Sequence, residues 1–395
     1  MQNKKMSMIG GALALVVSFG LGPAALEKLV SAQAQPSVPQ FEPDPLFFKN
    51  LPNRWVTGQI PGIDVDRNDH VWVIHRPATI PDGEKSASFN PPQSLCCIPA
   101  PPVLEFDQNG TFVKAWGGPG AGYEWPTGEH GIHADYRNNI WVGGNGKGDH
   151  HILKFTNTGK FLLQIGKKNQ SKGSNDTANL NGAAGIFVYQ KTNEVFVADG
   201  YTNRRVIVYD ADTGAYKRHW GAYGKQPEDL KNPPREQIVQ GPSPTFFSTP
   251  VHGVVVANDD TVYAADRSNN RIQVFRLDGT FIKEAFVNRR TLQNEGTVHG
   301  FALSRDPAQR YLYVADGSNK AVHVVDRQTL ALLDSIGGHA GHNAREFFHI
   351  HSIGGPDSKG NLYFGEVNDG QRYYRYLLRG MGRPANPGYS TISSQ

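Results

Sequence analysis

One phrase of sequence repeats along the chain, and this repeat limits the fold more than any other feature. Each copy starts with a short apolar stretch, passes through Asn, Asp or Gly turn residues, and continues into an alternating strand. The copies begin at Gly62, His130, Gly185, His252, His299 and His351. The second strands are at 71–73, 140–142, 195–197, 262–264, 312–314 and 362–364. Third strands are clear at 205–209, 271–275 and 321–325, and fourth strands follow after Asp or Gly turns.

Four short strands joined by Gly or Asn turns make one antiparallel blade. A single blade cannot bury both of its faces, but six blades in a ring can, and the closed ring leaves only short protected edges. We therefore predict an all-β fold, a six-bladed β-propeller of four-stranded antiparallel blades, over residues 58–380. Residues 35–57 are expected to close the ring by pairing with the last blade, and residues 381–395 to form a C-terminal tail. The inserts at 77–102 and 222–248 are expected to be loops around one mouth.

The first 34 residues have the pattern of a secretory signal peptide. Two lysines precede an apolar run that is short for a membrane span, and Ala-Gln-Ala at 32–34 fits the small-x-small cleavage pattern. We expect a secreted or periplasmic protein without stable membrane insertion after cleavage, with an uncleaved anchor as the alternative. In an oxidising compartment the adjacent Cys96 and Cys97 could form a vicinal disulfide, remain thiols or link to another chain.

The charge of the chain is nearly balanced, with 40 basic and 36 acidic residues and no basic stripe. A nucleic-acid-binding surface needs clustered Lys and Arg side chains. We therefore expect no nucleic-acid partner.

Histidine recurs at one position of the repeat, two residues before the central apolar residue of each first strand. The six occupants are Pro61, His130, Ala184, His252, His299 and His351. The first strand of each blade lines the channel, so equivalent positions share one height around the axis. His130, His252 and His351 belong to alternate blades, and three imidazoles arranged in this way leave one coordination position open, as in catalytic zinc sites. Hydrogen-bonded channel residues without a metal are the alternative.

Two arginines share a second position of the repeat, just past the second strand. Arg76 and Arg267 occupy it in the first and fourth copies, which face each other across a six-bladed ring. Two guanidiniums aimed at one cavity favour a ligand with a carboxylate, because the planar guanidinium binds carboxylate through parallel hydrogen bonds. The alternative is pairing with an Asp of a neighbouring blade, which we predict for Arg205 and Arg271. Tyr201 lies one residue beyond this position in the third copy and is expected in the same mouth.

The chain resembles known propellers at two levels. The segments 265–275 and 198–206 resemble the NHL repeat. The whole propeller resembles the lyase domain of peptidylglycine α-amidating enzymes, and the matching segments are 58–76, 130–132, 199–203, 251–267 and 349–353. That family is a six-bladed propeller that cleaves a peptidyl α-hydroxyglycine to a peptide amide and glyoxylate.

The resemblance implies a role for each of the candidate site residues. Zinc on the α-hydroxyl would lower its pKa, and loss of the hydroxyl proton would expel the amide nitrogen. The implied roles are zinc ligands at His130, His252 and His351, a general base at Tyr201, a cation beside that base at Arg76, and a binder of the substrate carboxylate at Arg267.

Some positions differ from the family pattern. The structural calcium of the family uses a side-chain carboxylate where this chain has Ser352, although the backbone carbonyls of Ile63 and Ile132 match its other ligands. A calcium ion would therefore lack one expected ligand. His349 stands where the family has a Met near the metal, and His299 where it has a non-ligand residue. Both are candidates for an additional metal ligand or site residue.

These observations favour an exported zinc-dependent lyase that cleaves a C–N bond at a hydroxylated α-carbon. The expected substrate is a small molecule or peptide with a carboxylate, and the products are an amide and glyoxylate or a related carbonyl compound. Four imidazoles at one height also resemble the iron site of carotenoid-cleaving oxygenases, so a four-His iron oxygenase is one alternative. A non-catalytic NHL binding platform is another.

Overall fold

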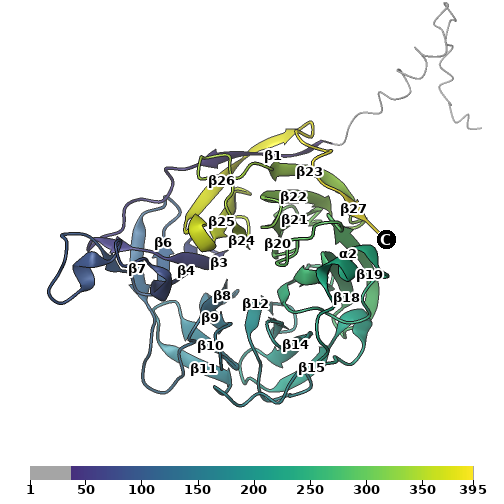
Figure 1. The fold of residues 1–395 in the computed structure, drawn as a ribbon, viewed down its shortest axis with the longest axis horizontal. Helices are drawn as coiled ribbons and strands as arrows, with labels where there is room; N and C mark the ends of the chain where they lie inside the picture. The colour runs from purple at the N-terminus through teal and green to yellow at the C-terminus, as the bar shows by residue number, and fades with distance from the viewer. Residues whose placement is uncertain (1–36, 395) are drawn as a thin grey trace, which may run out of the picture. The chain divides into compact units, whose positions relative to one another are not determined.

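The computed structural model describes residues 37–394, and the predicted signal peptide at 1–34 lies outside the described residues. Figure 1 shows their strands arranged as a ring of sheets around one axis. The ring consists of six antiparallel sheets of four strands, one of which gains a fifth strand. The prediction of an all-β, six-bladed propeller is therefore confirmed. Within residues 37–394, no helix has the length and apolar character needed to cross a membrane.

Each blade contributes one inner strand, and these inner strands contact one another in ring order. The inner strands are β3 (Gln59–Val65), β8 (Glu129–Ala134), β12 (Ala183–Tyr189), β16 (Val251–Val256), β20 (Gly300–Leu303) and β24 (Ile350–Gly354). The second strands are β4 (Val71–Arg76), β9 (Asn139–Gly144), β13 (Glu194–Asp199), β17 (Thr261–Asp266), β21 (Tyr311–Asp316) and β25 (Leu362–Glu366). The third strands are β6 (Val103–Phe106), β10 (His151–Thr156), β14 (Arg205–Asp210), β18 (Arg271–Arg276), β22 (Ala321–Asp326) and β26 (Tyr373–Gly382). The outer strands are β7 (Phe112–Trp116), β11 (Phe161–Gly166), β15 (Tyr216–Trp220), β19 (Phe281–Val287), β23 (Leu332–Gly337) and β1 (Val38–Asp44).

The two ends of the described chain join blades built from distant parts of the sequence. The N-terminal strand β1 pairs with β26 and is the outer strand of the last blade, which closes the ring (Figure 1). Within the segment expected to be a C-terminal tail, β27 (Ile392–Ser393) pairs with β19. Because a blade at the closure contains strands from both ends, opening the ring requires breaking a whole ladder of backbone hydrogen bonds.

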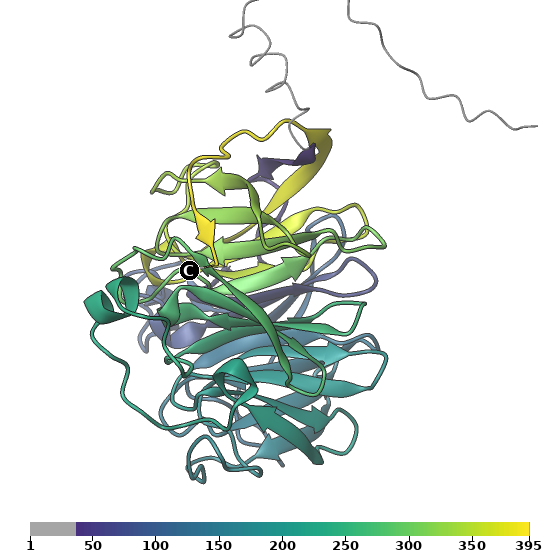
Figure 2. The ribbon, with the colours of Figure 1, turned by 90° about the vertical axis from the view of Figure 1, so that its right-hand side faces the viewer.

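The long inserts carry the remaining short elements. In the 77–102 insert, β5 (Ile98–Pro99) pairs in parallel with β2 (Trp55–Val56), and Cys96 and Cys97 form a vicinal disulfide. The 222–248 insert contains the helix α2 (Arg235–Gln240), which Figure 2 shows at one face of the ring. The short 3₁₀ helices are η1 (Pro77–Thr79), η2 (Ser86–Ser88), η3 (Ala222–Gly224), η4 (Arg267–Asn269) and η5 (Asn368–Gly370).

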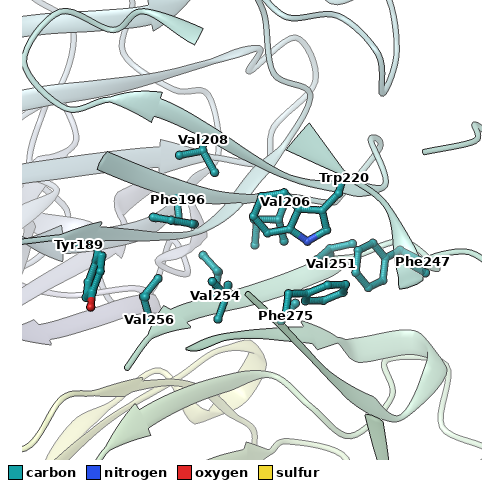
Figure 3. Packing of buried hydrophobic residues seen from close by; sticks show 14 residues of the cluster. Tyr189, Phe196, Val206, Val208, Trp220, Phe247, Val251, Val254, Val256 and Phe275 are labelled. Atoms are coloured by element: carbon teal, nitrogen blue, oxygen red, sulfur yellow. The ribbon is translucent and has the colours of Figure 1, made fainter. Parts of the chain in front are cut away.

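Apolar side chains of neighbouring blades pack against each other between the sheets. Figure 3 shows this packing between the β12–β15 blade and the β16–β19 blade, where Val206, Trp220 and Phe275 are buried together. A cluster of buried apolar residues lies at each of the other blade interfaces. Burying one such side chain is worth roughly 1.5–3 kcal/mol, so the interfaces hold the ring together and fix the height of each inner strand.

A buried ion pair links the second and third strands in two of the blades. Arg205 pairs with Asp199 at 2.9 Å, and Arg271 pairs with Asp266 at 2.7 Å, with all four side chains fully buried. Each partner belongs to the same blade as its arginine, so our prediction of an Asp from the neighbouring blade was wrong. The register explains the difference, because Asp and Arg are directly opposite each other on adjacent strands.

Replacing Arg271 by alanine is expected to lower the free energy of unfolding by about 3–5 kcal/mol, because Asp266 would be left as a buried charge without its partner. The guanidinium also donates to the carbonyl oxygens of Pro244 and Phe246 in the 222–248 insert, so these contacts would be lost too. Urea unfolding followed by fluorescence measures the change. Arg276→Ala at the exposed end of the same strand is the control, with an expected change within about 0.5 kcal/mol. Equal stability of the two variants would contradict this interpretation.

Candidate active site

Three histidines meet at the axis of the ring. His130 lies near the start of β8, His252 near the start of β16 and His351 near the start of β24, which are the inner strands of alternate blades. Their ring centroids are 4.6–5.0 Å apart. One ligand atom of each lies within 4.8 Å of the others. The structure thus brings these three side chains together in a group that could hold a metal ion.

Backbone carbonyls fix which nitrogen of each imidazole points to the axis. Each Nδ1 lies against the carbonyl oxygen of the residue at the same repeat position in the next blade. The contacts are His130 with Ala184 at 3.0 Å, His351 with Pro61 at 2.9 Å, and His252 with His299. Because a carbonyl oxygen only accepts hydrogen bonds, Nδ1 carries the proton and Nε2 keeps a lone pair. Metal-binding histidines commonly have such a second contact.

Glycines after these positions let the inner strands come close enough for the contact. A Cβ atom on Gly131 would lie 2.4 Å from the carbonyl oxygen of Ala184, which is the acceptor for His130. A Cβ atom on Gly62 would likewise lie 2.6 Å from the carbonyl oxygen of His130. A larger residue would push neighbouring strands apart, so glycine here serves the orientation of the imidazoles.

The environment keeps the three imidazoles neutral, and it supplies too few hydrogen-bond donors for the lone pairs on their Nε2 atoms. Burial lowers the pKa of all three well below the usual range, and the charge of Arg76 adds to this for His130 and that of Arg267 for His252. Nε2 of His252 is 3.1 Å from Nε2 of His351. Two lone pairs at this distance repel each other unless a cation or a proton lies between them. A divalent cation fits this donor set, and three imidazoles with an open position are typical of catalytic zinc.

Tyr201 reaches the histidines from the loop after β13. Its Oη lies 2.9 Å from Nε2 of His130 and 3.1 Å from Nε2 of His252. One hydroxyl donates to only one of these acceptors at a time, so the phenol does not satisfy the group. Nη1 of Arg267 donates to the same Oη at 3.4 Å. Tyr201 therefore connects the candidate metal ligands to one of the two candidate arginines.

Neutral acceptors hold Arg76. Its Nε donates to the carbonyl oxygen of Glu129 at 2.8 Å, Nη1 to Oε1 of Gln59 at 3.2 Å, and Nη2 to Oδ1 of Asn145 at 3.0 Å. Since none of these acceptors carries a charge, no hydrogen-bonded carboxylate cancels the charge of the guanidinium. Burial lowers the pKa of Arg76, and the nearby Tyr201 opposes this shift. Arg76 thus places a positive charge near the phenol without a direct hydrogen bond to it.

Arg267 has an unused donor. Its side chain is buried, and within the described part of the chain its Nε has no hydrogen-bond partner. The guanidinium carbon lies 5.6 Å from the ring centroid of Tyr201. A buried donor without a partner is costly, which makes this nitrogen a candidate contact for a ligand.

His299 and His349 lie in a second cluster, together with Glu295. Oε2 of Glu295 is 2.8 Å from Nε2 of His349 and 3.7 Å from Nε2 of His299. The backbone N–H of Gly317 donates to Nδ1 of His299 at 3.2 Å, and burial lowers the pKa of His299 to about 4. The neutral ring therefore carries its proton on Nε2, which cannot also bind a metal. This geometry does not favour a fourth His ligand, on which the iron oxygenase alternative depends.

Sequence reasoning missed Glu295. The residue precedes His299 by four positions, and a carboxylate at this spacing from a candidate ligand was the signal that could have indicated it. The contact with His349 could not be read from the sequence, because it joins a loop of the fifth blade to the start of the sixth.

A central cavity of about 470 Å³ continues from the three histidines along the inner strands. Ile63 and Ile132, the predicted calcium ligands, line it with buried side chains one step beyond the glycines. Oγ of Ser352 is buried there and has no hydrogen-bond partner among residues 37–394. The calcium site stays a prediction.

The fold and the site define a six-bladed β-propeller with a group of axial histidines that could hold a metal. The model of the NHL repeat family matches residues 251–275, which run from the start of β16 into β18 and include His252 and Arg267. A solved structure of a protein of unknown function from Bacteroides thetaiotaomicron VPI-5482 has a TM-score of 0.52 and 12% identity, and covers 82% of this chain and 70% of that one. At this identity the likeness shows the fold alone.

Curated relatives give a more specific likeness. The chain is 26% identical to "Peptidylglycine alpha-amidating monooxygenase" of Rattus norvegicus over 63% of this chain and 25% of that protein. It is 27% identical to "Probable peptidyl-alpha-hydroxyglycine alpha-amidating lyase pgal-1" of Caenorhabditis elegans over 55% of each. The chain is thus a six-bladed propeller that contains an NHL repeat and resembles peptidyl-α-hydroxyglycine α-amidating lyases. The matches span about a quarter and about half of these relatives.

Proposed function

We propose that this protein is an exported, zinc-dependent lyase that cleaves a C–N bond at a hydroxylated α-carbon. The substrate carries a carboxylate, and the products are an amide and glyoxylate or a related carbonyl compound. One observation carries the proposal: the phenol oxygen of Tyr201 lies within 3.1 Å of Nε2 of both His130 and His252 and also contacts Arg267. These contacts support the proposal, because they bring the proposed proton acceptor and the proposed carboxylate binder to the candidate cation site.

Different side chains of this site bind the substrate and the metal ion. Arg267 binds the substrate carboxylate through its unused Nε donor, which orients the α-carbon toward the histidines. His130, His252 and His351 would hold the zinc ion through Nε2. A zinc ion held there supplies Lewis-acid activation of a hydroxyl group. The three imidazoles are buried, so little of their surface is open to solvent.

Tyr201 moves the proton. In its phenolate form, Oη accepts the proton of the substrate's α-hydroxyl group, and the electron pair of that O–H bond becomes the second bond of the new carbonyl group. The C–N bond breaks at the same carbon with its electron pair remaining on the amide nitrogen, and this nitrogen takes up the proton that Tyr201 accepted. Arg76, whose hydrogen-bond acceptors are all neutral, stabilises the negative charge that develops on the phenol and the substrate oxygen.

Turnover of a simple α-hydroxyglycine tests the proposal. The mature chain, loaded with zinc, is expected to convert α-hydroxyhippurate to benzamide and glyoxylate in equal amounts above the rate of spontaneous decay. Because the site is chiral, turnover of a racemate is expected to stop near one half. Protein stripped by a chelator should be inactive and should recover when zinc is added back. Failure of the zinc-loaded protein to release glyoxylate would reject the proposed reaction.

A further inference from the structure

The cluster of Glu295, His299 and His349 lies beside the site, and the proposed reaction does not use it. Both imidazoles are buried, with exposed fractions of 1% for His299 and 6% for His349, whereas the side chain of Glu295 is 41% exposed. The ion pairs of Glu295 within the described residues are with these two imidazoles, through Oε2. One oxygen of the carboxylate therefore faces two buried imidazoles, and the rest of the side chain is partly exposed to solvent.

The ligand atoms of this cluster lie within 4.8 Å of one another, but the protonation of His299 favours a carboxylate beside two imidazoles over a second metal site. The N–H of Gly317 occupies Nδ1 of His299, so the proton of that ring lies on Nε2, which is 3.7 Å from Oε2 of Glu295, too far for a hydrogen bond. A ring nitrogen that carries a proton has no lone pair for a cation. The neighbouring His299 and His349 also hold the pKa of the Glu295 carboxyl well below its usual range. The group is thus negatively charged and restricted in orientation.

Glu295 and Arg267 line the same pocket. This pocket has a volume of about 280 Å³ and lies between the 222–248 insert and the loop that carries Glu295, with Ile238 of α2 in its wall. The third charged residue of its lining, Arg235, is occupied: its guanidinium donates to the carbonyl oxygens of Ser268 and Thr291. One cation and one anion of the lining therefore remain for a ligand, and they do not neutralise each other in a direct ion pair.

The two charges fit the two ends of one substrate. In the proposed reaction Arg267 binds the carboxylate of the α-hydroxyglycine. The remaining part of the substrate, which is released as the amide, is then the part that can contact Glu295. The pocket is smaller than the ~300–1,000 Å³ of typical ligand sites, which suits a single short arm. A fixed carboxylate attracts a cationic group and repels an anionic one.

We propose that Glu295 selects substrates whose amide-forming part carries a cationic group, an ammonium or a guanidinium, within reach of the pocket. This inference rests on the proposed function and names the substrate class of the same site. The preferred substrate is then zwitterionic, with its carboxylate on Arg267 and its cation on Glu295.

Two matched substrates test the inference. One is an N-acyl-lysyl-α-hydroxyglycine, and the other is the norleucine analogue, which has the same chain without the ammonium group. Wild-type protein is expected to prefer the lysyl substrate by about 10- to 100-fold in kcat/KM, as for a hydrogen bond to a charged group. In Glu295→Gln this preference should fall about 10-fold or more, and in Glu295→Lys it should reverse in favour of a glutamyl substrate.

Controls separate this inference from the proposed function. Glu228→Gln removes an exposed carboxylate from the same insert and should leave the lysyl preference unchanged. Zinc content and melting temperature show that each variant is folded. If Glu295→Gln does not fold, the preference of the wild-type protein for the lysyl substrate tests the inference by itself. Equal turnover of the two substrates by wild type overturns the inference and leaves the lyase function standing. Turnover of neither overturns the lyase function, and the inference falls with it.

Discussion

Replacing His252 by alanine is expected to remove bound zinc and to reduce turnover by at least about 100-fold. Loss of an outer partner of a metal ligand already costs about 10–100-fold in metal affinity or activity, and loss of the ligand itself should cost more. His252 is the central member of the group, since its Nε2 lies 3.1 Å from both Nε2 of His351 and Oη of Tyr201. Mass spectrometry of natively purified protein measures the metal, and glyoxylate release measures the turnover.

A matched histidine provides the control for this variant. His339 is exposed, and His339→Ala is expected to keep both the metal and the turnover of wild type. Full metal content in His252→Ala would mean that the axial histidines are hydrogen-bonded channel residues and not ligands. The far-ultraviolet circular dichroism spectrum checks that the propeller is intact, because removing one axial imidazole leaves the blade interfaces unchanged.

The repeat explains why so much of this site could be predicted. In a propeller, equal positions in the repeat lie at equal heights, so counting along the sequence is enough to place His130, His252 and His351 in one ring. The same counting places Arg76 and Arg267 at one mouth. The six-bladed fold follows from the same signal, because five copies each supply four strands with turn residues between them, and the sixth supplies three strands that β1 completes.

The parts that could not be predicted depend on atoms outside the repeat. The role of His299 depends on one backbone N–H, that of Gly317, which decides where the ring carries its proton. Glu295 lies in a loop whose length differs from blade to blade, so no register predicts where its carboxylate lies. The pairing of β27 with β19 likewise involves residues after the last copy. Sequence periodicity thus predicts the ring but not the contacts that loops make across it.

Replacing Tyr201 by phenylalanine is expected to lower kcat by about 10²–10⁴-fold while zinc stays bound, because the variant keeps the ring and loses only the group that carries the proton. The packing of the ring should survive, since the aromatic contacts with His130 and Arg267 need no hydroxyl group. Tyr216→Phe on the outer strand β15 removes a hydroxyl group far from the axis and serves as the control, with wild-type kcat expected.

The combination of measurements distinguishes the roles open to Tyr201. A general base that is lost lowers kcat and leaves the metal content unchanged, whereas a residue that only orders the histidines lowers both. If Tyr201→Phe retained kcat within about tenfold of wild type, the phenol would not be the base, and the proton would have to leave by another route. Because Oη contacts both His130 and His252, such a result would point to Tyr201 as a hydrogen-bond partner of the neutral imidazoles and would weaken the lyase mechanism at its central step.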